Sequence, residues 1–582
     1  METKDTIHNI RHSLAHLLAM AILEWDPRAK RAIGPVIENG FYYDFELSKP
    51  LSPAELPALL ATMKRRAKEG LPFSGQTLTT ADARERFKDE PYKLELIEEF
   101  VKEGKELTAY HTDEFVDLCA GGHVENTKEI NTDAFTLTKV AGAYWRGDEK
   151  NKMLTRVYGV AFLTKEELDA YTKKIEEAEK RDHRKLGKEL GLFVFSPLVG
   201  PGLPLWTTKG TILRTELDNF VWSLRKKRGY QKVTIPHITK KDLYETSGHW
   251  AKFSEELLKV QSREDKFYAM KPMNCPHHTQ IYAAEKRSYR ELPIRYTETT
   301  MVYRDEQSGE LSGLSRVLSI TQDDAHVFCR ENQIKEEVFA IWDIIDEFYK
   351  TMGLPIKHVR LSFHDPKHIE KYLGNEETWK KSEDTLRSLA KERGITFIEA
   401  PGEAALYGPK LDFMANDSIG REWQVATIQL DMNLPERFDL TCTNESSVEE
   451  RIVMIHAAIM GSLERFLAMY IEHTAGVFPL WLSPLQVAIL PIGENELSYA
   501  KSVADALTKK DVRVELYNQN ETLGAKIRRA KLEKVPYFLV IGKKEVEEKT
   551  VTVETRSGEK VGALSLSNFT ERVLNEIKEK SA

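Results

Sequence analysis

Residues 303–326 read YRDEQSGELSGLSRVLSITQDDAH, which predicts a strand, a glycine-bearing loop and a second strand. This hairpin carries Arg304 and Arg316, whose guanidinium groups suit an anionic phosphate ligand. The second strand places Gln322, Asp324 and His326 at alternate positions, and these side chains share one face because strand side chains alternate with period two. One face thus combines an amide, a carboxylate and an imidazole beside a cationic loop. The pattern predicts an ATP-using active site with a metal.

The size and composition of the chain limit the classes of protein it can belong to. Its 582 residues and 66.8 kDa are too many for one core and indicate three or four domains. Four cysteines are too few for a disulfide framework, so we expect a reducing, cytoplasmic setting. The apolar stretch over residues 14–23 is too short to span a bilayer, so we expect no membrane partner. A net charge of −7 excludes a general nucleic-acid coat, so RNA contacts must come from local basic patches.

The pattern of elements divides the chain into four segments. Residues 1–163 mix a helix over 9–25, short strands over 40–45 and a loop over 119–123. Residues 164–191 predict a linker helix that is polar nearly all round, which is typical of helices that bridge domains. Residues 192–482 predict an α+β domain with a mainly antiparallel sheet, and they contain no GxxxxGKS/T motif for a P-loop. Residues 483–582 alternate strands and helices, as a small α/β unit does.

The linker also carries a basic run. Its spacing fits either a solvated face or an RNA contact, and a solvated face is the simpler interpretation. The run consists of Lys180, Arg181, Arg184, Lys185 and Lys188.

Three candidate zinc ligands lie far apart in sequence: Cys275 in MNCPHH, His326 in QDDAH and His456 in VMIHAAIMGSLERF. Taken singly, each also fits a structural role, because a lone buried cysteine acts as a small hydrophobic residue and a lone histidine commonly satisfies a core hydrogen bond. Together, three protein ligands with an open fourth position would suit a zinc ion that binds substrate.

His456 and Arg465 can face one site only if the chain changes conformation between them. They are nine residues apart, so one continuous helix would place them roughly 180° apart. Gly461 is the expected break, with a strand before it and a helix over residues 462–473 after it. Arg465 would then project from the first turn of that helix. The alternative is an arginine on a surface helix with its head group in solvent.

At this point the motifs resemble those of a known family. The hairpin with Arg304 and the segment GSLERF with Arg465 resemble motifs two and three of class II aminoacyl-tRNA synthetases. RKKRGYQKVTIPHI, with Pro236, resembles motif one, which forms the dimer interface in that class. MNCP, TQDDAH and IHAAI together resemble the threonyl-tRNA synthetases of bacterial type. The resemblance runs from about residue 8 to the C-terminus.

The resemblance implies a class II catalytic domain with an antiparallel sheet, acting on ATP, L-threonine and tRNA(Thr). It implies one Zn²⁺ per subunit, held by Cys275, His326 and His456, and Mg²⁺ with ATP. The threonine carboxylate would attack the α-phosphate, and the acyl group would then pass to the 3′-terminal adenosine. Positioning and cationic stabilisation of the phosphoryl oxygens would supply most of the catalysis.

Individual roles follow from the same resemblance. Arg304 should bind the α-phosphate, Arg465 the γ-phosphate, and Glu306 the adenine amino group. Gln322 should help bind the adenylate, and Asp324 should take the substrate hydroxyl. The residues implied to be catalytic are Arg304, Arg465, Gln322, Asp324 and Lys410. The other implied ATP positions are Arg316, Ile320 and Gln424, and the other implied substrate positions are Met273, Tyr407, Gln429 and Ser462.

A zinc ion makes physical sense for threonine. An apolar pocket separates threonine poorly from valine, whereas a site that binds the hydroxyl rejects an analogue lacking it by about 10⁴ to 10⁵. Serine keeps the hydroxyl and lacks one methyl group, a difference of only about 1–3 kcal/mol. Serine should therefore pass the first site, and a second, hydrolytic site is expected.

The first segment contains candidates for that second site. His12 and His16, at i and i+4, share one helical face, and Cys119 and His123 flank a Gly-Gly turn. These four residue types also form a plausible tetrahedral zinc site. HSLAHLLAMAI, IGPVIENGFYYDF, DLCAGGH and YWRGD resemble instead the α+β editing domain of the family, which hydrolyses Ser-tRNA(Thr) without a required metal. On that resemblance the editing residues are His12, His16, Tyr43, Lys93, Asp117, Cys119 and His123.

The last segment resembles the α/β anticodon-binding domain of the same enzymes. Arginine forks and carboxylates are sensible readers of unstacked base edges. The implied contacts are Asn520, Lys526, Arg528 and Glu545. The resemblance also implies a cytoplasmic homodimer that begins close to the editing domain, without the ubiquitin-like domain of many relatives.

The sequence departs from the family pattern at several positions. Ile320 replaces the phenylalanine that stacks on adenine and Leu318 an arginine, so adenine should pack on an aliphatic face. MNCPHH adds His277 beside a proposed zinc ligand, and CAGGH removes a cation from the editing loop. Glu554 stands in place of an arginine that contacts the anticodon.

Two other functions are compatible with parts of the sequence pattern. A catalytically silent paralogue that binds RNA as a regulator should have lost phosphate-binding arginines or zinc ligands, and this chain keeps them. A class II enzyme for proline or serine would not need the Cys/His/His set.

Overall fold

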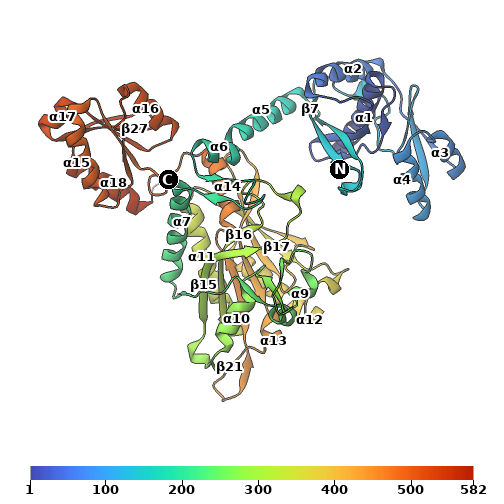
Figure 1. Cartoon of the computed structure of the whole chain (residues 1–582). Coiled ribbons are helices and arrows are strands. Elements are labelled where there is room, and N and C mark those ends of the chain that lie inside the picture. The colour runs from blue at the N-terminus through green and yellow to red at the C-terminus, as the bar shows by residue number, and fades with distance from the viewer. Residues whose placement is uncertain (1, 581–582) are drawn as a thin grey trace. The chain divides into compact units, whose positions relative to one another are not determined.

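The structure, a computed structural model, describes residues 2–580, without the side chains of residues 2–4 and 308. The chain forms two compact units, Met1–Glu176 and Glu177–Ala582 (Figure 1). Within residues 2–580 no helix is both long and apolar enough to cross a bilayer.

The N-terminal unit packs two helices on an antiparallel sheet. α1 (Glu2–Trp25) and α2 (Leu56–Glu69) share a core with a sheet of order β1-β3-β8-β7, and β2 pairs with β3. The predicted helix over 9–25 is confirmed, and it begins earlier because residues 2–8 contain no proline or glycine to break it. The strands are β1 (Lys30–Arg31), β2 (Val36–Ile37), β3 (Gly40–Glu46), β7 (Phe135–Tyr144) and β8 (Met153–Ala161).

A smaller layer completes this unit. The sheet β4-β5-β6 shares a second core with two short helices, in which Phe87, Ile97 and Leu107 are buried. Its elements are β4 (Ser74–Leu78), α3 (Thr80–Arg86), α4 (Pro91–Lys102), β5 (Leu107–Thr112) and β6 (Phe115–Leu118).

The stretch predicted as one linker helix forms two helices, α5 (Lys165–Arg181) and α6 (His183–Glu189). The backbone of Asp182 leaves the helical conformation, with φ −48° and ψ 121°. Its carboxylate accepts from the backbone N–H of Arg184 at 2.8 Å and caps the second helix. An aspartate can end one helix and begin the next, which polarity alone did not reveal.

The larger part of the second unit is built on an eight-stranded sheet, in the order β11-β15-β16-β23-β20-β19-β17-β18. All neighbours are antiparallel except β11/β15 and β17/β18, so the predicted mainly antiparallel sheet is confirmed. The strands are β11 (Gln231–Lys232), β15 (Ile294–Tyr303), β16 (Ser319–Cys329), β17 (Ile356–Phe363), β18 (Phe397–Pro401), β19 (Lys410–Asn416), β20 (Glu422–Asp431) and β23 (Val453–Ala458).

Amphipathic helices share the main core with this sheet. On α11 (Ile334–Thr351), Val338, Trp342 and Ile345 recur at helical spacing and are buried. The other helices are α7 (Thr208–Lys226), α8 (Lys241–Ser247), α9 (His249–Lys252), α10 (Cys275–Ala283), α12 (Glu376–Arg393), α13 (Asn433–Arg437) and α14 (Leu463–Thr474). Small sheets are formed by β9 (Phe193–Val194) with β10 (Leu205–Trp206), by β12 (Ile238–Lys240), β13 (Lys259–Gln261) and β14 (Phe267–Met270), and by β21 (Thr441–Thr443) with β22 (Glu449–Arg451).

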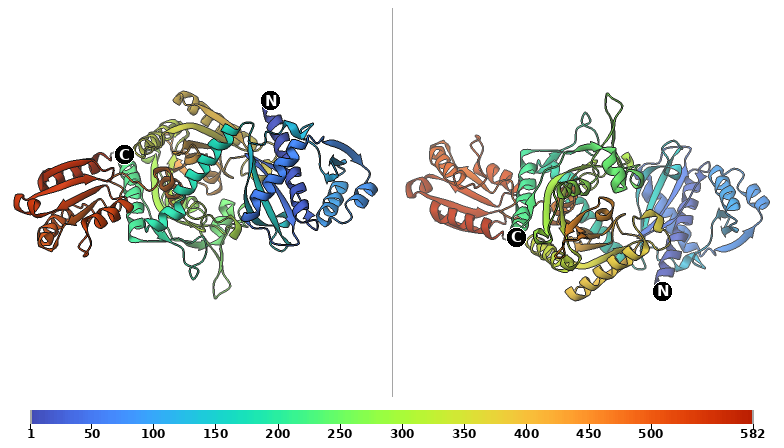
Figure 2. Two further views of the ribbon diagram at one scale, coloured as in Figure 1. Left: turned by 90° about the horizontal axis from the view of Figure 1, so that it is seen from above. Right: turned by 90° about the horizontal axis from the view of Figure 1, so that it is seen from below.

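The C-terminal part carries a five-stranded sheet of order β25-β24-β26-β27-β28 with helices on both faces (Figure 2). Alternate residues of β24 divide between two cores: Val487 and Ile489 lie with α15 and α18, and Ala488 and Leu490 with α16. The predicted strand–helix alternation is confirmed up to β26, after which two antiparallel strands follow. The elements are β24 (Val487–Pro491), α15 (Leu497–Thr508), β25 (Val514–Leu516), α16 (Leu523–Leu532), β26 (Tyr537–Ile541), α17 (Lys543–Glu548), β27 (Thr550–Thr555), β28 (Lys560–Ser565) and α18 (Leu566–Glu579).

Candidate active site

The predicted hairpin forms strands β15 and β16, and its second strand faces a cavity. Gln322, Asp324 and His326 all line this cavity of about 120 Å³, as their alternate spacing predicted. The cavity is also lined by Met273, Cys275, Tyr407, Gln429 and His456, which come from four other segments of the chain.

The three candidate zinc ligands converge although they lie far apart in sequence. Cys275 is the first residue of α10, and His326 and His456 are cross-strand partners on β16 and β23. One potential ligand atom from each lies within 4.8 Å of the other two, and all three residues are buried. His326 Nε2 and His456 Nδ1 are 3.1 Å apart. A tetrahedral zinc ion with bonds of about 2.0–2.1 Å would separate two nitrogens by about 3.3 Å, so the donor set fits zinc.

Hydrogen bonds to the far side of each imidazole fix which nitrogen faces the centre. His456 Nε2 lies 2.8 Å from Asp431 Oδ2, which leaves His456 Nδ1 facing inward. His326 Nδ1 lies 2.8 Å from His278 Nδ1, which leaves His326 Nε2 facing inward. Partners of this kind orient metal-bound histidines and raise their basicity. The His277 imidazole that the sequence adds lies outside the three-residue cluster.

Burial sets the protonation of the same groups. It raises the pKa of the Cys275 thiol well above its ordinary value. Burial, followed by the nearby His456 and Arg225, lowers the pKa of His326 well below its ordinary value. The imidazole is therefore neutral and can act as a ligand. A bound cation deprotonates a coordinating thiol, so the cluster is suited to a metal rather than to free thiolate chemistry.

A larger cavity of about 700 Å³ adjoins the first and shares several residues with it. It brings together every residue assigned to ATP from the resemblance, together with Lys410 and Ser462. Its lining includes Arg304, Glu306, Arg316, Ile320, Gln322, Lys410, Gln424, Gln429, Ser462 and Arg465.

Two of the arginines that line this cavity have no carboxylate partner among the residues that the structure describes. The Arg304 guanidinium lies 5.4 Å from the ring centre of Phe253, and that of Arg465 lies 6.0 Å from the ring centre of Trp423. Unpaired guanidinium groups facing one cavity suit a polyanionic ligand such as a triphosphate. Arg316 differs, because its Nη2 contacts Glu306 at 2.6 Å and Glu310 at 3.0 Å.

Buried carboxylates hold the chain where β23 gives way to α14. The Asp323 carboxylate accepts from the backbone N–H groups of Ile459 and Met460, at 2.8 and 2.9 Å, and pairs with Arg225. Gly461 then adopts φ +67°, and α14 begins two residues later with Arg465 in its first turn. The predicted break at Gly461 is confirmed.

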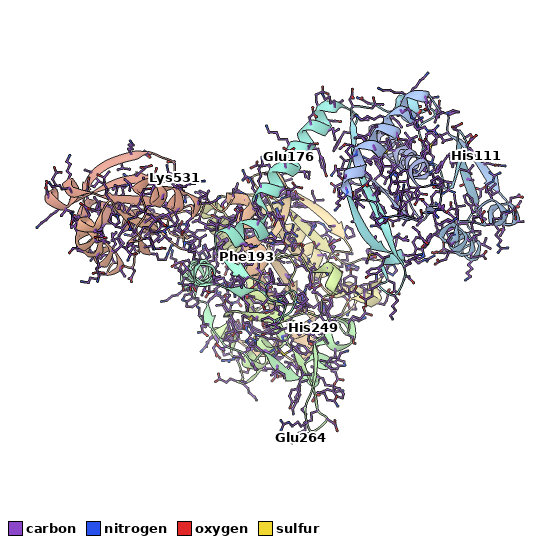
Figure 3. All side chains as sticks on the ribbon, turned by 45° about the horizontal axis from the view of Figure 1, so that its top comes forward. His111, Glu176, Phe193, His249, Glu264 and Lys531 are labelled. Atoms are coloured by element: carbon purple, nitrogen blue, oxygen red, sulfur yellow. The ribbon has the colours of Figure 1, made fainter. Side chains whose placement is uncertain are left out.

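Sequence reasoning missed several residues that hold this site. The missed partners of the zinc cluster are Asp431 and His278, described above. Asn274 donates to Asp324 Oδ2 at 3.0 Å and orients that carboxylate. His249 (labelled in Figure 3) is fully buried, and its Nε2 lies 3.0 Å from Met273 Sδ. Asp431 and His249 reach these groups only through the tertiary fold, whereas Asn274 and His278 lie beside Cys275 in the segment MNCPHH, where the sequence did not show what they contact.

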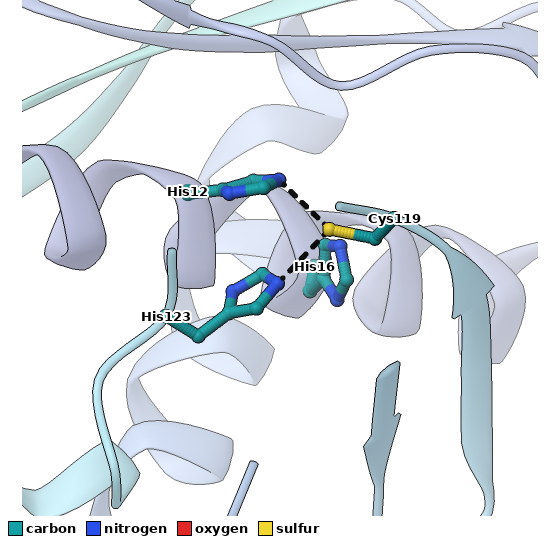
Figure 4. Close-up of side chains that lie close together, drawn as sticks. All are labelled: His12, His16, Cys119 and His123. Carbon is teal, nitrogen blue, oxygen red and sulfur yellow. Dashed lines mark hydrogen bonds between the residues drawn. The ribbon is translucent and has the colours of Figure 1, made fainter. Parts of the chain in front are cut away.

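In the N-terminal unit a second cluster joins α1 to the loop after β6 (Figure 4). Cys119 Sγ lies 3.3 Å from His12 Nε2 and 3.2 Å from His123 Nε2. His12, His16, Cys119 and His123 each offer one ligand-type atom within 4.8 Å of the others. The loop turns through Gly121 and Gly122, at φ +96° and +85°, as the Gly-Gly pair predicted.

Asp117 connects the other expected editing residues to this cluster. Its carboxylate accepts from Tyr43 Oη at 2.5 Å, pairs with Lys93 Nζ at 2.6 Å and lies 3.9 Å from His16 Nε2. Burial opposes its ionisation, yet Lys93, His16 and Arg31 lower the pKa of Asp117 to about 2. Burial lowers the pKa of His16 to about 3, and it raises the pKa of the Cys119 thiol to about 11. The His16 imidazole and the Cys119 thiol are therefore neutral, whereas the Asp117 carboxylate beside them is ionised.

The four expected anticodon residues do not share one environment. Asn520 and Arg528 are exposed. Glu545 accepts from the Gly542 N–H at 2.8 Å and from Thr552 Oγ1 at 2.7 Å. Lys526 is buried at 4% exposure, and its ammonium donates to the Pro491 carbonyl at 3.0 Å. The structure thus gives Lys526 an internal partner, and Glu554 contacts Lys531 at 3.3 Å.

Three family models match the chain. The one described as "tRNA synthetase class II core domain (G, H, P, S and T)" matches residues 258–474. "Anticodon binding domain" matches residues 486–576. "Threonyl and Alanyl tRNA synthetase second additional domain" matches residues 107–158.

Individual proteins match over almost the whole length. Threonine–tRNA ligase of Gloeobacter violaceus is 48% identical over 565 residues, covering 96% of this chain and 90% of that protein. Threonine–tRNA ligase of Thermus thermophilus is 47% identical over 586 residues, covering 98% and 88%. A crystal structure of the RNA binding domain of threonyl-tRNA synthetase from Cryptosporidium parvum matches with TM-score 0.65 and 38% identity, covering 68% of this chain and 98% of that one.

Proposed function

The chain belongs to the threonine–tRNA ligase family, and from that premise we propose which residues carry each step of its reaction. The enzyme uses ATP to activate L-threonine as threonyl-adenylate and transfers the acyl group to the 3′ end of tRNA(Thr). The observation that carries the assignment is the convergence of Cys275, His326 and His456 within 4.8 Å, beside a cavity lined by two unpaired arginines.

Zn²⁺ would be held by these three residues and would supply a cation that can bind the amino and hydroxyl groups of threonine. When bound, it supplies a charge that recognises the alcohol. The Asp324 carboxylate accepts a hydrogen bond from the threonine hydroxyl, and Asn274 orients this carboxylate. Tyr407 donates to Gln429 Oε1 at 2.7 Å and stacks on His456, so these two residues close the pocket around the methyl group. Met273 lines the same wall.

The adenylate forms where the two cavities meet. A carboxylate oxygen of threonine attacks the α-phosphorus of ATP, and the bond to pyrophosphate breaks. Arg304 stabilises the α-phosphoryl oxygens and Arg465 the γ-phosphate, with Mg²⁺ bound to ATP. Gln322 lines both cavities and Lys410 lines the larger one, and they hold the adenylate, while Ser462 caps the helix that carries Arg465.

Recognition of the adenine base uses other residues of the larger cavity. Glu306 accepts from the adenine amino group, Ile320 packs on the ring, and Gln424 and Arg316 complete the site. The Glu306 carboxylate also pairs with Arg316 Nη2 at 2.6 Å.

We further propose that the N-terminal unit hydrolyses Ser-tRNA(Thr) with His12, His16, Tyr43, Lys93, Asp117, Cys119 and His123. Water adds to the seryl ester carbonyl, the bond to the ribose oxygen breaks, and that oxygen receives a proton from the attacking water, so that serine and tRNA are released. Imidazoles with pKa values as low as that of His16 are weak bases, so they position the water as neutral acceptors rather than remove its proton outright.

A metal at this second cluster is the competing assignment, because its four ligand-type atoms also lie within 4.8 Å. Metal analysis separates the two. Loss of one zinc in Cys275→Ser and none in Cys119→Ser supports editing without metal, whereas loss of zinc in Cys119→Ser contradicts it.

The remaining proposals concern partners and limits. Asn520 and Arg528 contact anticodon bases directly, while Glu545 and Lys526 order the loops around them. The segment with Pro236 and the edge strand β11 forms a homodimer interface. Four free thiols fit a reducing cytoplasm. The domains are residues 1–163 for editing, 164–191 as linker, 192–482 for catalysis and 483–582 for the anticodon.

ATP–pyrophosphate exchange tested with each amino acid separates this function from its rivals. Exchange should depend on threonine, with weaker exchange for serine. Exchange with proline alone, or no exchange by a folded protein that retains zinc, would contradict the assignment.

A further inference from the structure

A histidine that lines neither cavity contacts the loop between β15 and β16, which carries Arg316. His183 is the first residue of α6 and is 4% exposed. Its Nε2 accepts a hydrogen bond from the backbone N–H of Leu314 at 3.0 Å. Leu314 lies in the loop between β15 and β16, two residues before Arg316. The helical connector, which has no assigned role in the reaction, thus holds this loop at one backbone atom.

Glu472 of α14 fixes the tautomer that this contact needs. Its Oε1 lies 2.6 Å from His183 Nδ1 and also accepts the His183 backbone N–H at 3.1 Å. Arg421 contacts the other carboxylate oxygen at 2.5 Å. Although burial opposes ionisation, these partners lower the pKa of Glu472, so the carboxylate is charged. The proton therefore lies on Nδ1, and Nε2 keeps the lone pair that Leu314 requires.

The loop is shaped for this approach. Gly313 adopts φ +51°, and a Cβ there would lie 2.4 Å from His183 Nε2. The side chain of Leu314 is fully buried in the same core as Leu186, one turn after His183 on α6. The backbone and side chain of one loop residue are thus both held against α6.

We propose that His183 is a positioning residue for ATP binding, which acts by fixing Leu314 so that the next residues line the nucleotide cavity. Those residues are Ser315, Arg316 and Val317. The proposal rests on ATP binding in that cavity and adds to it a residue from outside the sheet. It places the connector helix, the ATP loop and the helix of Arg465 in one hydrogen-bonded unit through His183 and Glu472.

Two substitutions separate the roles of the two ring nitrogens. His183→Gln places an amide oxygen near the Nε2 position, where it can accept from Leu314. His183→Asn keeps a donor near Nδ1 for Glu472 and leaves the Leu314 N–H without an acceptor. A buried N–H without a partner is costly, so we expect His183→Asn to weaken ATP binding about tenfold. His183→Gln should remain within about threefold of wild type.

His364 provides a matched control. Its Nδ1 lies 2.7 Å from Glu383 Oε1, which also accepts the His364 backbone N–H at 3.0 Å. This repeats the His183–Glu472 arrangement at a position that lines neither cavity. His364→Asn keeps a donor near Nδ1 for Glu383, removes no acceptor for a backbone N–H among the described residues, and should leave ATP binding unchanged.

The measurement is the Kd of ATP by titration calorimetry on the full chain, with the KM values for ATP and threonine from pyrophosphate exchange. Calorimetry reports on the loop even if the assigned ligase chemistry were wrong. A rise in the Kd and KM of ATP for His183→Asn, with threonine KM unchanged and recovery in His183→Gln, supports the proposal. Equal ATP affinity in all variants, equal losses for Asn and Gln, or a fall in kcat alone would overturn it.

Discussion

Single residues behind the ligands decide how the zinc cluster is oriented. Asp431 Oδ1 accepts from the backbone N–H groups of Asn433 and Leu434, at 2.8 and 2.9 Å, while Oδ2 faces His456 Nε2. One carboxylate thus joins the start of α13 to the imidazole of His456, a proposed zinc ligand. The His456 tautomer is fixed by the Asp431 carboxylate, which backbone N–H groups hold in place.

The first prediction concerns Asp431→Asn. The amide can keep the oxygen that caps α13 but replaces the acceptor for His456 Nε2–H with a donor. We expect zinc affinity to fall about 10- to 100-fold with little change in fold. Competition with a chromogenic chelator measures it. Asp44→Asn, a buried carboxylate in the N-terminal unit, is the control, and equal zinc affinity in wild type and Asp431→Asn would contradict the prediction.

The second prediction follows from the buried histidines of the editing cluster. Burial lowers the pKa of His16 to about 3 and that of His123 to about 2, whereas both titrate near 6.5 when unfolded. Between pH 6.5 and 3 only the unfolded state binds these protons, so stability present above pH 6.5 is lost as the pH falls. Each contributes about 2 kcal/mol of this loss at pH 5. Asp117 adds none there, because its own loss begins only below about pH 4.

Hydrogen exchange of peptides from α1 in the full chain measures this locally. Protection, corrected for the intrinsic exchange rate, should fall from pH 7 to pH 5. His16→Asn should remove the part of this fall that comes from protonation of His16. Identical protection at both pH values would rule out the neutral cluster.

At the scale of elements, the turn between β23 and α14 aims Arg465 at the cavity. Gly461→Ala meets no neighbouring atom within 4 Å, so only its φ of +67° is at issue. We expect a loss of about 1–2 kcal/mol in stability and weaker ATP binding, as the start of α14 shifts. Gly524→Ala is the control, since it also meets no atom but carries no positive φ. A Gly461→Ala protein that melts and binds ATP like Gly524→Ala would contradict this account.

Local signals predicted the elements on which the site is built. Period-two spacing predicted that Gln322, Asp324 and His326 face one cavity, and the angle between His456 and Arg465 predicted the break at Gly461. Such inferences succeed because they depend on the geometry of one strand or one turn. The family resemblance supplied the assignment of the three candidates, Cys275, His326 and His456, to one zinc ion.

These local sequence patterns did not predict the tertiary contacts. Asp431 contacts His456 and His278 contacts His326 only after distant segments have come together, and His183 contacts the distant Leu314 in the same way. From the sequence Lys526 is expected to contact RNA, yet in the fold its ammonium donates to the Pro491 carbonyl. The helix break at Asp182 was missed because a capping aspartate also suits a polar linker.

For the whole molecule, the division into two compact units predicts that editing and activation can be impaired separately. Cys119→Ala removes only a sulfur atom that lies 3.2–3.3 Å from two imidazoles. Hydrolysis of Ser-tRNA(Thr) should fall at least about tenfold, the value of one lost hydrogen bond, while pyrophosphate exchange is unchanged. Cys442→Ala, in the second unit, should alter neither rate. A parallel fall of both activities in Cys119→Ala would show that the units do not act independently.

The central claim is that a zinc ion on Cys275, His326 and His456 selects threonine by its hydroxyl. The most direct test measures bound zinc together with threonine- and valine-dependent pyrophosphate exchange in wild type and Cys275→Ser, with the buried Cys442→Ser as control. Wild type and Cys442→Ser should hold one zinc per chain and favour threonine over valine by about 10⁴ or more. Cys275→Ser should lose the zinc and the exchange with threonine. Undiminished, threonine-selective exchange by a zinc-free Cys275→Ser protein would contradict the account.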